Sequence, residues 1–464
     1  MSRGDTIAAI ATAPGRGGVA VVRVSGPEAF GIGERLTGRT PAIGRAVFSR
    51  LSSCSSRSSD SRNSSSSRDS QSVEKNTLDE GLVLAFKAPH SYTGEDVVEF
   101  QCHGGAVTPR RVLEACLAAG ARLARRGEFT ERAFLNGKID YSQAESVLDL
   151  IDAKTARAAD AALEGLAGRR RRTCRDLYES ALDLSTRLEH ALDIDEGELP
   201  ADFLQSALSS VSRLKSSLRE AVRRSSEGRL LQRGALVVLA GPPNAGKSSL
   251  LNALLEENRA IVSEVPGTTR DSIEAWIDLD GWPVRLVDTA GLREAKDEIE
   301  GEGVRRSEEL IAKADVVVAL TDCGDRNVAA PLSKPCSVGA ATFLSPQTLI
   351  VHSKCDLGRA EGLNVSSKTG EGLDELKRAI VAKLEEKVVA ADEGDVPEGD
   401  VAAYHEALAL LDEGLKTRDL RHEEDLVLMA NAVRAAAERL GTAIGATYSA
   451  DLLDKLFSRF CVGK

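Results

Sequence analysis

The stretch ALVVLAGPPNAGKSSLLNALL places a glycine-rich loop between an apolar strand and an apolar helix. The loop has the spacing Gly241-x-x-x-x-Gly246-Lys247-Ser248, whose glycines let backbone N–H groups close around phosphate oxygens. Lys247 adds a positive charge, Ser248 adds a hydroxyl ligand for magnesium, and the helix N-terminus adds a favourable dipole. Because strands and helices alternate from 235 to 380, we expect a parallel sheet with helices on both faces.

Two later segments match the remaining phosphate and magnesium contacts of a GTPase. The loop PGTTRD (266–271) supplies Thr269 as the natural second magnesium ligand. Next, SIEAWIDLDGWPVRLV predicts two alternating strands joined by a hairpin turn at Asp280-Gly281. Asp288 ends the second of these strands, at the start of the sequence DTAG, and is expected to hold magnesium through water.

A third segment predicts guanine specificity. TLIVHSKCDLG places Ser353-Lys354-Cys355-Asp356 after an apolar strand, where Asp356 can accept hydrogen bonds from guanine's N1–H and amino group. The stem of Lys354 is expected to lie over the base, and adenine would leave Asp356 unpaired. Ser353 replaces the usual Asn, at an expected cost of about 1 kcal/mol. The loop SSKTG (366–370) fits the end of the base pocket, with Ser367 in place of a more usual Ala.

The residue that orients the attacking water is not the glutamine that many GTPases place after DTAG. Leu292 stands there, and its alkyl chain neither donates nor accepts a hydrogen bond. The residues alone leave four acidic candidates open: Glu294, Asp297, Glu298 and Glu300. The amide oxygen of Asn244 can face a monovalent cation beside the phosphates, where potassium would replace an arginine finger.

Composition limits the remaining possibilities. A chain of 464 residues predicts two or three domains, and no apolar run reaches the roughly 18 residues of a membrane span. The start of the chain shows no signal or presequence pattern, so we expect a cytoplasmic protein, with a mitochondrial or plastid matrix as the alternative. A net charge of −11 argues against general affinity for nucleic acid. The run 169–172 (RRRR) is one local basic patch, for which a solvated helix face is the favoured interpretation.

Outside the phosphate-binding module, an α+β region comes first. We expect strands at 6–12, 19–24, 82–87 and 97–101 and a helix from Pro27. A serine-rich tract at about 52–72 has almost nothing to bury and is expected to be a disordered insertion.

Helical patterns follow from about residue 140. Ser142 and Glu145 have capping-box spacing, and a heptad-like stripe begins at Leu177. This stripe consists of Leu177, Ala181, Leu184, Leu188 and Ala191. Since the chain is helical again from about 400 to 460, the α/β module is expected to interrupt a helical domain whose two halves pack together.

Two charges interrupt apolar strands of the first region. Arg23 lies in VAVVRV and Glu99 in VVEF, and a buried charge is costly unless something pairs with it. They could bind a ligand, pair with each other, or face water on an edge strand. Near the C-terminus, Cys461 is open to two interpretations, a nucleophile or a small buried apolar residue.

With these motifs in order, the chain resembles the tRNA modification GTPases of the MnmE/TrmE family nearly from end to end. The resemblance rests on DTIAAIATAPGRGGVAVVRVSG, PHSYTGEDVVEFQCHGG, RRGEFTERAFLNGKIDYSQAE, GPPNAGKSSLLNAL, PGTTRDSIE, DTAGLRE and LFSRFCVGK. It implies a multidomain α+β and α/β fold of three parts. A folate-binding and dimerisation domain spans 1–138, a helical domain spans 139–233 and 386–464, and a Ras-like P-loop GTPase domain spans 234–385.

The resemblance also implies roles for individual residues of the GTPase domain. Potassium-dependent pairing of two such domains would activate hydrolysis, Glu300 would orient the water, and Arg293 would help position the loop. The potassium ligands would be Asn244, Ser263, Val265 and Thr268. The magnesium ligands would be Ser248 and Thr269. Together with the motifs, nucleotide contacts are expected from Asn244, Ala245, Gly246, Lys247, Ser248, Ser249, Ser263, Glu264, Val265, Pro266, Gly267, Thr268, Thr269, Asp288, Thr289, Ala290, Gly291, Ser353, Lys354, Asp356, Ser366, Ser367 and Lys368.

In the N-terminal domain, the family's folate contacts fall on Arg23, Glu99, Lys138 and Lys464. The ligand implied is a one-carbon donor of the 5-formyltetrahydrofolate or methylenetetrahydrofolate type. A glutamate suits the N–H edge of the pterin, and the cations suit carboxylates and carbonyls.

The implied activity is potassium-stimulated GTP hydrolysis within a tRNA-modifying complex. A homodimer would join a flavoprotein of the MnmG/GidA type in a heterotetramer and add a carboxymethylaminomethyl-type group to C5 of the wobble uridine (U34) of certain tRNAs. Two rival functions remain: a regulatory or ribosome-assembly GTPase, and a scaffold whose folate domain is degenerate.

Overall fold

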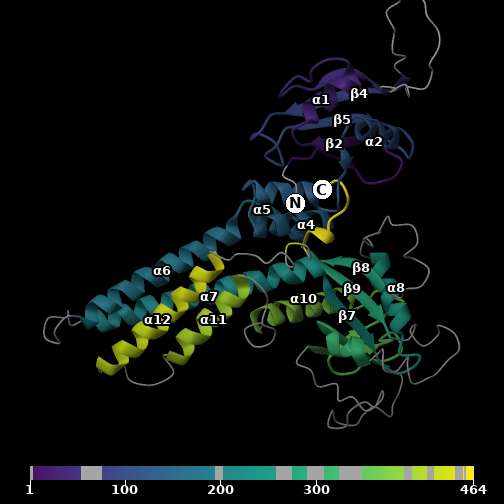
Figure 1. Ribbon diagram of the computed structural model, residues 1–464. Helices are drawn as coiled ribbons and strands as arrows, with labels where there is room; N and C mark the ends of the chain where they lie inside the picture. The colour runs from purple at the N-terminus through teal and green to yellow at the C-terminus, as the bar shows by residue number, and fades with distance from the viewer. Residues whose placement is uncertain are drawn as a thin grey trace, which may run out of the picture. The chain divides into compact units, whose positions relative to one another are not determined.

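The computed structural model describes residues 4–53, 76–193, 202–257, 274–289, 308–322, 347–390, 400–414, 423–444, 453 and 456–464. The chain forms two compact units, one of residues 1–148 with 447–464 and the other of residues 149–446 (Figure 1). Within the described ranges, no helix is both long and apolar enough to cross a membrane.

The first unit contains a six-stranded sheet in the order β3-β4-β5-β2-β1-β6. The strands are β1 (Ile7–Ile10), β2 (Val19–Ser25), β3 (Val47–Ser53), β4 (Asn76–Phe86), β5 (Val97–His103) and β6 (Arg122–Leu123). Helices α1 (Ala29–Thr37) and α2 (Thr108–Ala118) pack on one face, against buried residues such as Val22, Val24 and Phe100. Because side chains alternate along a strand, Val21 and Arg23 belong to the opposite face.

The strands expected near 6–12, 19–24, 82–87 and 97–101 and the helix after Pro27 are confirmed. The one expected at 82–87 is the end of the longer β4. The serine-rich tract lies outside the described residues except for Ser52 and Ser53, which end β3 and so correct the predicted start of the insertion.

Helix α3 spans Glu128–Leu135, and α4 spans Tyr141–Asp152. The capping box predicted at Ser142 and Glu145 is wrong, because the box of α4 lies two residues earlier in the chain. The reciprocal capping bonds of α4 join Asp140 and Gln143: Gln143 N donates to Asp140 Oδ1 at 2.8 Å, and Asp140 N donates to Gln143 Oε1 at 2.9 Å. Aspartate caps a helix as well as serine does, so Ser142 falls inside the first turn.

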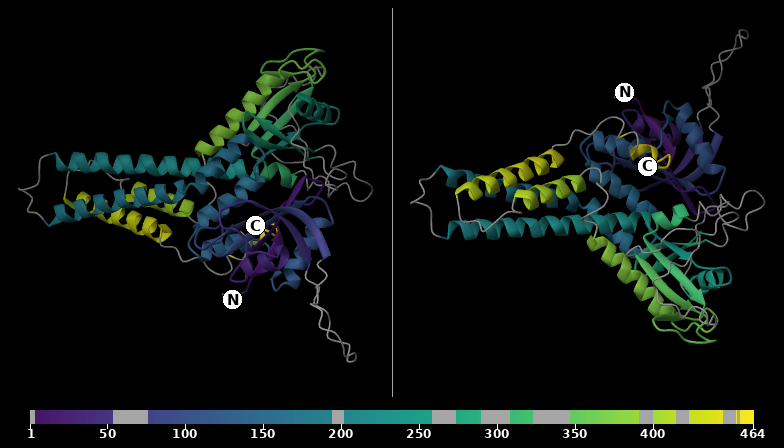
Figure 2. Two further views of the ribbon diagram at one scale, coloured as in Figure 1. Left: turned by 90° about the horizontal axis from the view of Figure 1, so that it is seen from above. Right: turned by 90° about the horizontal axis from the view of Figure 1, so that it is seen from below.

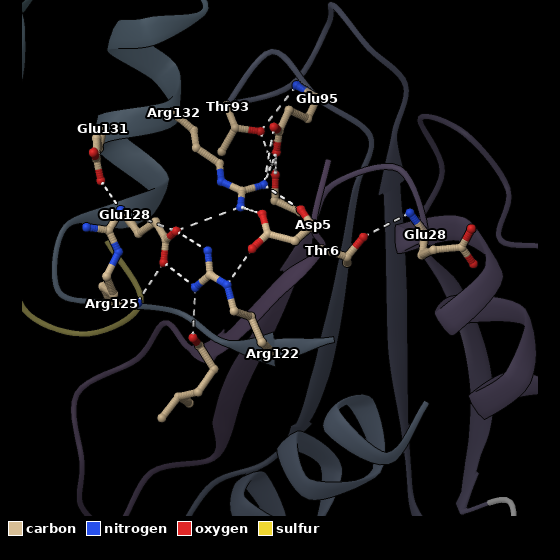
Figure 3. Close-up of polar contacts among 12 residues, drawn as sticks. Asp5, Thr6, Glu28, Thr93, Glu95, Arg122, Arg125, Glu128, Glu131 and Arg132 are labelled. Atoms are coloured by element: carbon tan, nitrogen blue, oxygen red, sulfur yellow. Dashed lines mark hydrogen bonds and ion pairs between the residues drawn. The ribbon is translucent and has the colours of Figure 1, made fainter. Parts of the chain in front are cut away.

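A charged network ties α3 to the sheet of this unit (Figure 3). Glu128 is buried and accepts hydrogen bonds from Arg122 Nη2 at 2.5 Å and from Arg125 N at 2.8 Å. Arg122 also donates to Asp5, which pairs with Arg132. Burial by itself raises the pKa of Glu128, but the bonds from Arg122 and Arg125 outweigh it and lower the pKa.

Four long helices form a bundle in the second unit. These are α6 (Arg169–Leu192), α7 (Phe203–Arg233), α11 (Asp400–Gly414) and α12 (Glu423–Ile444), with the shorter α5 (Ala156–Leu166) beside them. Every residue of the predicted stripe of α6 is buried in their shared core, which confirms that prediction. Both views in Figure 2 show α11 and α12 alongside α6 and α7, so helices before and after the α/β module pack together.

The α/β module holds a second six-stranded sheet, in the order β12-β11-β10-β7-β9-β8. The strands are β7 (Ala235–Ala240), β8 (Glu274–Leu279), β9 (Trp282–Asp288), β10 (Val316–Asp322), β11 (Thr348–Ser353) and β12 (Leu363–Val365). Every neighbouring pair is parallel except β8 with β9. Positive φ values of 50° at Asp280 and 85° at Gly281 confirm the predicted hairpin turn. Helices α8 (Lys247–Glu257) and α10 (Leu373–Ala390) complete the described part of the module.

The buried carboxylate of Asp315 contacts the segments by which the chain enters and leaves this module. Asp315 is fully buried and accepts hydrogen bonds from Arg233 at the end of α7 and from Leu236 N in β7. Lys387 of α10 lies 2.8 Å from the same carboxylate. Burial opposes ionisation, but these three partners lower the pKa of Asp315 and keep it charged. Asp315 therefore links the end of α7 to β7, the first strand of the module along the chain.

Candidate functional site

The glycine-rich loop follows β7 and leads directly into α8, as predicted. Gly241 has a φ of 150°, and a Cβ there would lie 2.5 Å from Leu320 O, so only glycine fits. Asn244 and Gly246 also have positive φ values, 64° and 85°. This backbone turns the loop back over the N-terminus of α8, where N–H groups lack helical partners and bind anions.

Lys247 and Ser248 occupy the first turn of α8. Lys247 is buried, and its Nζ donates to Gly241 O at 3.0 Å and to Pro242 O at 2.8 Å. Ser248 Oγ donates to Asp288 Oδ2 at 2.5 Å. The structure therefore brings together a hydroxyl and a carboxylate oxygen, and magnesium prefers such hard oxygen ligands. The donor set fits the predicted metal.

Thr289 fixes the strand end that carries Asp288. Its Oγ1 donates to Leu239 O at 2.9 Å, across the parallel pair of β9 and β7. Asp288 and Thr289 are both buried. Beside them, Ala245 is buried while Asn244 and Ser249 are exposed at the loop surface.

The predicted base pocket lies at the ends of β11 and β12. Asp356 is exposed, and its Oδ1 accepts a hydrogen bond from the buried Ser366 at 2.7 Å. Ser366 Oγ also accepts from the backbone N–H groups of Lys368 and Thr369, both at 3.3 Å. Ser367 between them is half-buried. Ser366 thus connects this loop to the Asp356 carboxylate and restricts the orientation of that side chain.

Ser353 and Lys354 face the neighbouring strand β10. Ser353 is buried, and its hydroxyl donates to Thr321 O at 3.0 Å. Lys354 Nζ lies 2.5 Å from Asp322 Oδ2. Sequence reasoning missed Asp322, whose one sequence signal is its position at the end of the apolar run VVVALTD.

Eleven predicted site residues lie outside the described part of the chain. They are Ser263, Glu264, Val265, Pro266, Gly267, Thr268, Thr269, Ala290, Gly291, Arg293 and Glu300. The predictions for the second magnesium ligand, the water-orienting residue and most of the potassium ligands therefore stay predictions.

In the first unit, Arg23 and Glu99 pair with each other, which was one of the sequence alternatives. Arg23 Nε lies 2.7 Å from Glu99 Oε1, and both side chains are less than one-fifth exposed. The edge-strand alternative is wrong, because β2 and β5 are interior strands. The guanidinium of Arg23 also lies over the rings of Tyr92 and Phe129, at 5.4 and 5.6 Å from their centroids. Sequence reasoning missed both aromatic residues.

The C-terminal segment brings Lys464 to the same cluster. Gly463 has a φ of 104°, and a Cβ there would lie 2.2 Å from Ile10 O, so the segment packs closely on the end of β1. Burial and the charge of Arg23 lower the pKa of Lys464. Two neighbouring cations, Arg23 and Lys464, suit an anionic ligand. Cys461 is exposed, so its interpretation as a buried apolar residue is wrong.

Lys138 is the remaining predicted ligand of this cluster. It follows α3 and is exposed, and its Nζ donates to Pro89 O at 3.0 Å. Its stem packs beside Gly94, where a Cβ would lie 3.1 Å from Lys138 Cγ. The described contacts do not join Lys138 to Arg23, Glu99 or Lys464.

The second unit therefore carries, on one mostly parallel sheet, a glycine-rich phosphate-loop motif, a hydroxyl–carboxylate pair that fits magnesium, and an aspartate where the sequence predicts guanine binding. This arrangement is that of a P-loop GTPase. Two family profiles match the chain, "GTP-binding protein TrmE N-terminus" over residues 6–138 and "MnmE helical domain" over residues 141–461. The chain belongs to the MnmE family of tRNA modification GTPases.

Curated relatives support this assignment along the whole chain. The tRNA modification GTPase MnmE of Symbiobacterium thermophilum is 41% identical over 469 residues, and the match covers 99% of each chain. The corresponding protein of Moorella thermoacetica is 40% identical over 481 residues, with the same coverage. Among solved structures, the G domain of the T. maritima FeoB iron transporter is 25% identical, covers 32% of this chain and 98% of that chain, and has a TM-score of 0.23. The chain is thus a GTPase that acts in tRNA modification, with a guanine nucleotide and magnesium as ligands.

Proposed function

We propose that this chain is the GTP-hydrolysing component of a complex that adds a carboxymethylaminomethyl-type group to C5 of wobble uridine (U34) in certain tRNAs. The observation that carries the proposal is the cluster of Arg23, Glu99 and Lys464 in the first unit. A GTPase that only switches partners needs no charged, largely buried cluster of this kind outside its nucleotide domain. A modification enzyme needs one for the carbon it transfers.

The cluster fits a folate-type one-carbon donor of the 5-formyltetrahydrofolate or methylenetetrahydrofolate kind. Such a donor supplies the one-carbon unit of the added group. Glu99 would accept the pterin's N–H groups, while Arg23 and Lys464 would hold carbonyl or carboxylate oxygens. Tyr92 and Phe129 restrict the position of Arg23, and Lys138 would reach the ligand from the loop side.

In the nucleotide site, Lys247 would hold phosphate oxygens. Ser248 and Thr269 would hold magnesium directly, and Asp288 would hold it through water. Asn244 would face a potassium ion with Ser263, Val265 and Thr268, and the ion's charge would replace that of an arginine finger. Glu300 would orient the water, with Arg293 positioning its loop. These roles are proposed because Leu292, which stands where many GTPases have a glutamine, cannot orient water.

Pairing with a second copy is supported by the exposed face of the first sheet. Phe48, Leu82 and Val19 are 63%, 38% and 59% exposed, although they lie in strands. The strand register places them on the face opposite α1 and α2. We propose that this face contributes to a homodimer, which joins a flavoprotein of the MnmG/GidA type in a heterotetramer that acts on tRNA.

Nucleoside analysis of tRNA from cells that lack the protein tests the function. We expect loss of the C5-modified wobble uridine, restored by the wild-type chain but not by Asp288→Asn. Unchanged nucleosides in the deleted strain would favour the regulatory or ribosome-assembly alternative.

Calorimetric titration of the full chain with 5-formyltetrahydrofolate tests the scaffold alternative. Binding should be lost in Arg23→Ala and kept in Arg50→Ala, whose exposed partner Glu80 lies in the same sheet. A wild-type chain that binds no folate would leave only a scaffold.

A further inference from the structure

Within the described part of the chain, the Ser353 hydroxyl makes one hydrogen bond, to Thr321 O at 3.0 Å, and its side chain is shorter than that of the usual asparagine. Asparagine offers two amide N–H donors and a carbonyl acceptor, whereas serine offers one O–H donor and the acceptor lone pairs of the same oxygen, on a shorter side chain. Even so, Lys354 keeps a left-handed backbone conformation, with a φ of 59°. A non-glycine residue in this region needs contacts that hold it there.

Among the described residues, two contacts hold Lys354: its carbonyl accepts a hydrogen bond from Leu357 N at 2.9 Å, and its side chain forms an ion pair with Asp322. Lys354 Nζ lies 2.5 Å from Asp322 Oδ2, and the two side chains are 36% and 28% exposed. Asp322 is the last residue of β10, and it pairs in register with Ser353 at the end of β11. The carboxylate therefore comes from the strand next to the base-binding segment.

We propose that Asp322 is a positioning residue for guanine-nucleotide binding, which holds the Lys354 stem across the base in a chain where Ser353 replaces the usual asparagine. The lysine stem has four methylene groups, and its rotamer freedom opposes any fixed position over the base. An anchored ammonium fixes both ends of the stem before the nucleotide arrives. Asp322 contacts no nucleotide atom in this role and acts through Lys354.

Asp322→Asn tests this role. We expect the full-length variant to bind GDP on the order of 5- to 10-fold more weakly than the wild type, because the stem must then be ordered on binding. At saturating GTP the kcat should be unchanged and only KM should rise, because Asp322 does not act on the phosphates. Glu375→Gln makes the same charge change in an exposed pair with Arg378 on α10 and should leave both constants unchanged.

Binding of inosine diphosphate distinguishes a loss of Lys354 positioning from a general disturbance of the base pocket. This nucleotide lacks the 2-amino group that Asp356 is expected to read, but it has the same ring face for the Lys354 stem. Asp322→Asn should weaken GDP and inosine diphosphate by the same factor. A changed ratio between the two would show that the Asp356 side of the pocket has moved, and would overturn the proposal.

A double-mutant cycle with Lys354→Met gives the decisive comparison. Methionine keeps an unbranched stem but has no ammonium, so Asp322→Asn should have no further effect in that background. An equal loss in both backgrounds, or no loss in the wild-type background, would overturn the proposal. A wild-type chain that fails to bind GDP would do the same. None of these measurements depends on folate or tRNA, so the proposal stands or fails separately from the modification reaction.

Discussion

Ser248 Oγ lies 2.5 Å from Asp288 Oδ2, although the serine lies in the first turn of helix α8 and the aspartate ends strand β9. The parallel pairing of β7 with β9 brings the two residues together at the carboxyl edge of the sheet. Ligands of open α/β sheets bind at this edge. Ser248 Oγ and Asp288 Oδ2 are therefore the two oxygen atoms at which magnesium-dependent nucleotide binding can be tested.

Asp288→Asn should therefore weaken GTP binding through the metal. We expect a loss of at least about tenfold in affinity in the presence of magnesium, because the amide carries no charge to balance the ion. With a chelator present, the variant and the wild type should bind GDP equally. A loss of the same size with and without magnesium would mean that Asp288 supports the loop and not the metal.

Glu300→Ala should abolish GTP hydrolysis while leaving nucleotide affinity intact. The expectation follows from the proposed role in orienting water, which involves no contact with the nucleotide, and the loss should be about 10²-fold or more. Single-turnover hydrolysis and GDP titration measure the two quantities separately. Glu294→Ala is the matched control from the same segment, and an unchanged rate in Glu300→Ala would remove the residue from the mechanism.

Potassium should accelerate hydrolysis relative to sodium at equal ionic strength. Asn244 is exposed in the loop with a φ of 64°, so its side chain can reach a cation beside the phosphates. Asn244→Ala should remove the difference between the two salts while leaving GDP affinity within about threefold, because the ion's charge is needed only as charge develops during hydrolysis. Equal rates of the wild-type chain in both salts contradict the cation proposal.

Ser353→Asn should tighten guanine-nucleotide binding by about 1 kcal/mol, or roughly fivefold, because an amide can make more than one hydrogen bond. A Cβ at Gly246 would lie 4.0 Å from Ser353 Cβ, so the phosphate loop is close enough for a longer side chain to reach. Thermal unfolding without nucleotide serves as the control for overpacking. A weaker or unchanged GDP affinity with normal stability would show that serine is not a deficit here.

Glu128→Gln should destabilise the first unit by about 1–3 kcal/mol at pH 7, because it weakens buried bonds to Arg122 and Arg125. The folded-state pKa of Glu128 lies below its ordinary value of 4.5. The stabilisation is therefore fully present above that value and is lost as the pH falls through the lowered folded pKa. The difference in Tm between wild type and variant should shrink as the pH falls below about 4.5. Glu80→Gln, in an exposed pair with Arg50, should show no such difference at either pH.

Much of the fold could be predicted from local patterns. The alternation of apolar residues in VAVVRV, the stripe of α6 and the Asp280-Gly281 turn each appear where expected. These features depend on periods of 2 and 3.6 and on backbone angles that few residues adopt. The capping box was missed because two overlapping patterns compete there, and the Asp140 carboxylate is the better partner for Gln143.

The sequence by itself determined the phosphate loop, the hairpin and the order of the nucleotide motifs, because each is encoded within a few consecutive residues. Only the tertiary structure decided that Arg23 pairs with Glu99, that Lys464 reaches them, and that Asp322 holds Lys354. Such contacts join residues far apart along the chain, and they depend on strand register and packing. No local period or spacing encodes those distances.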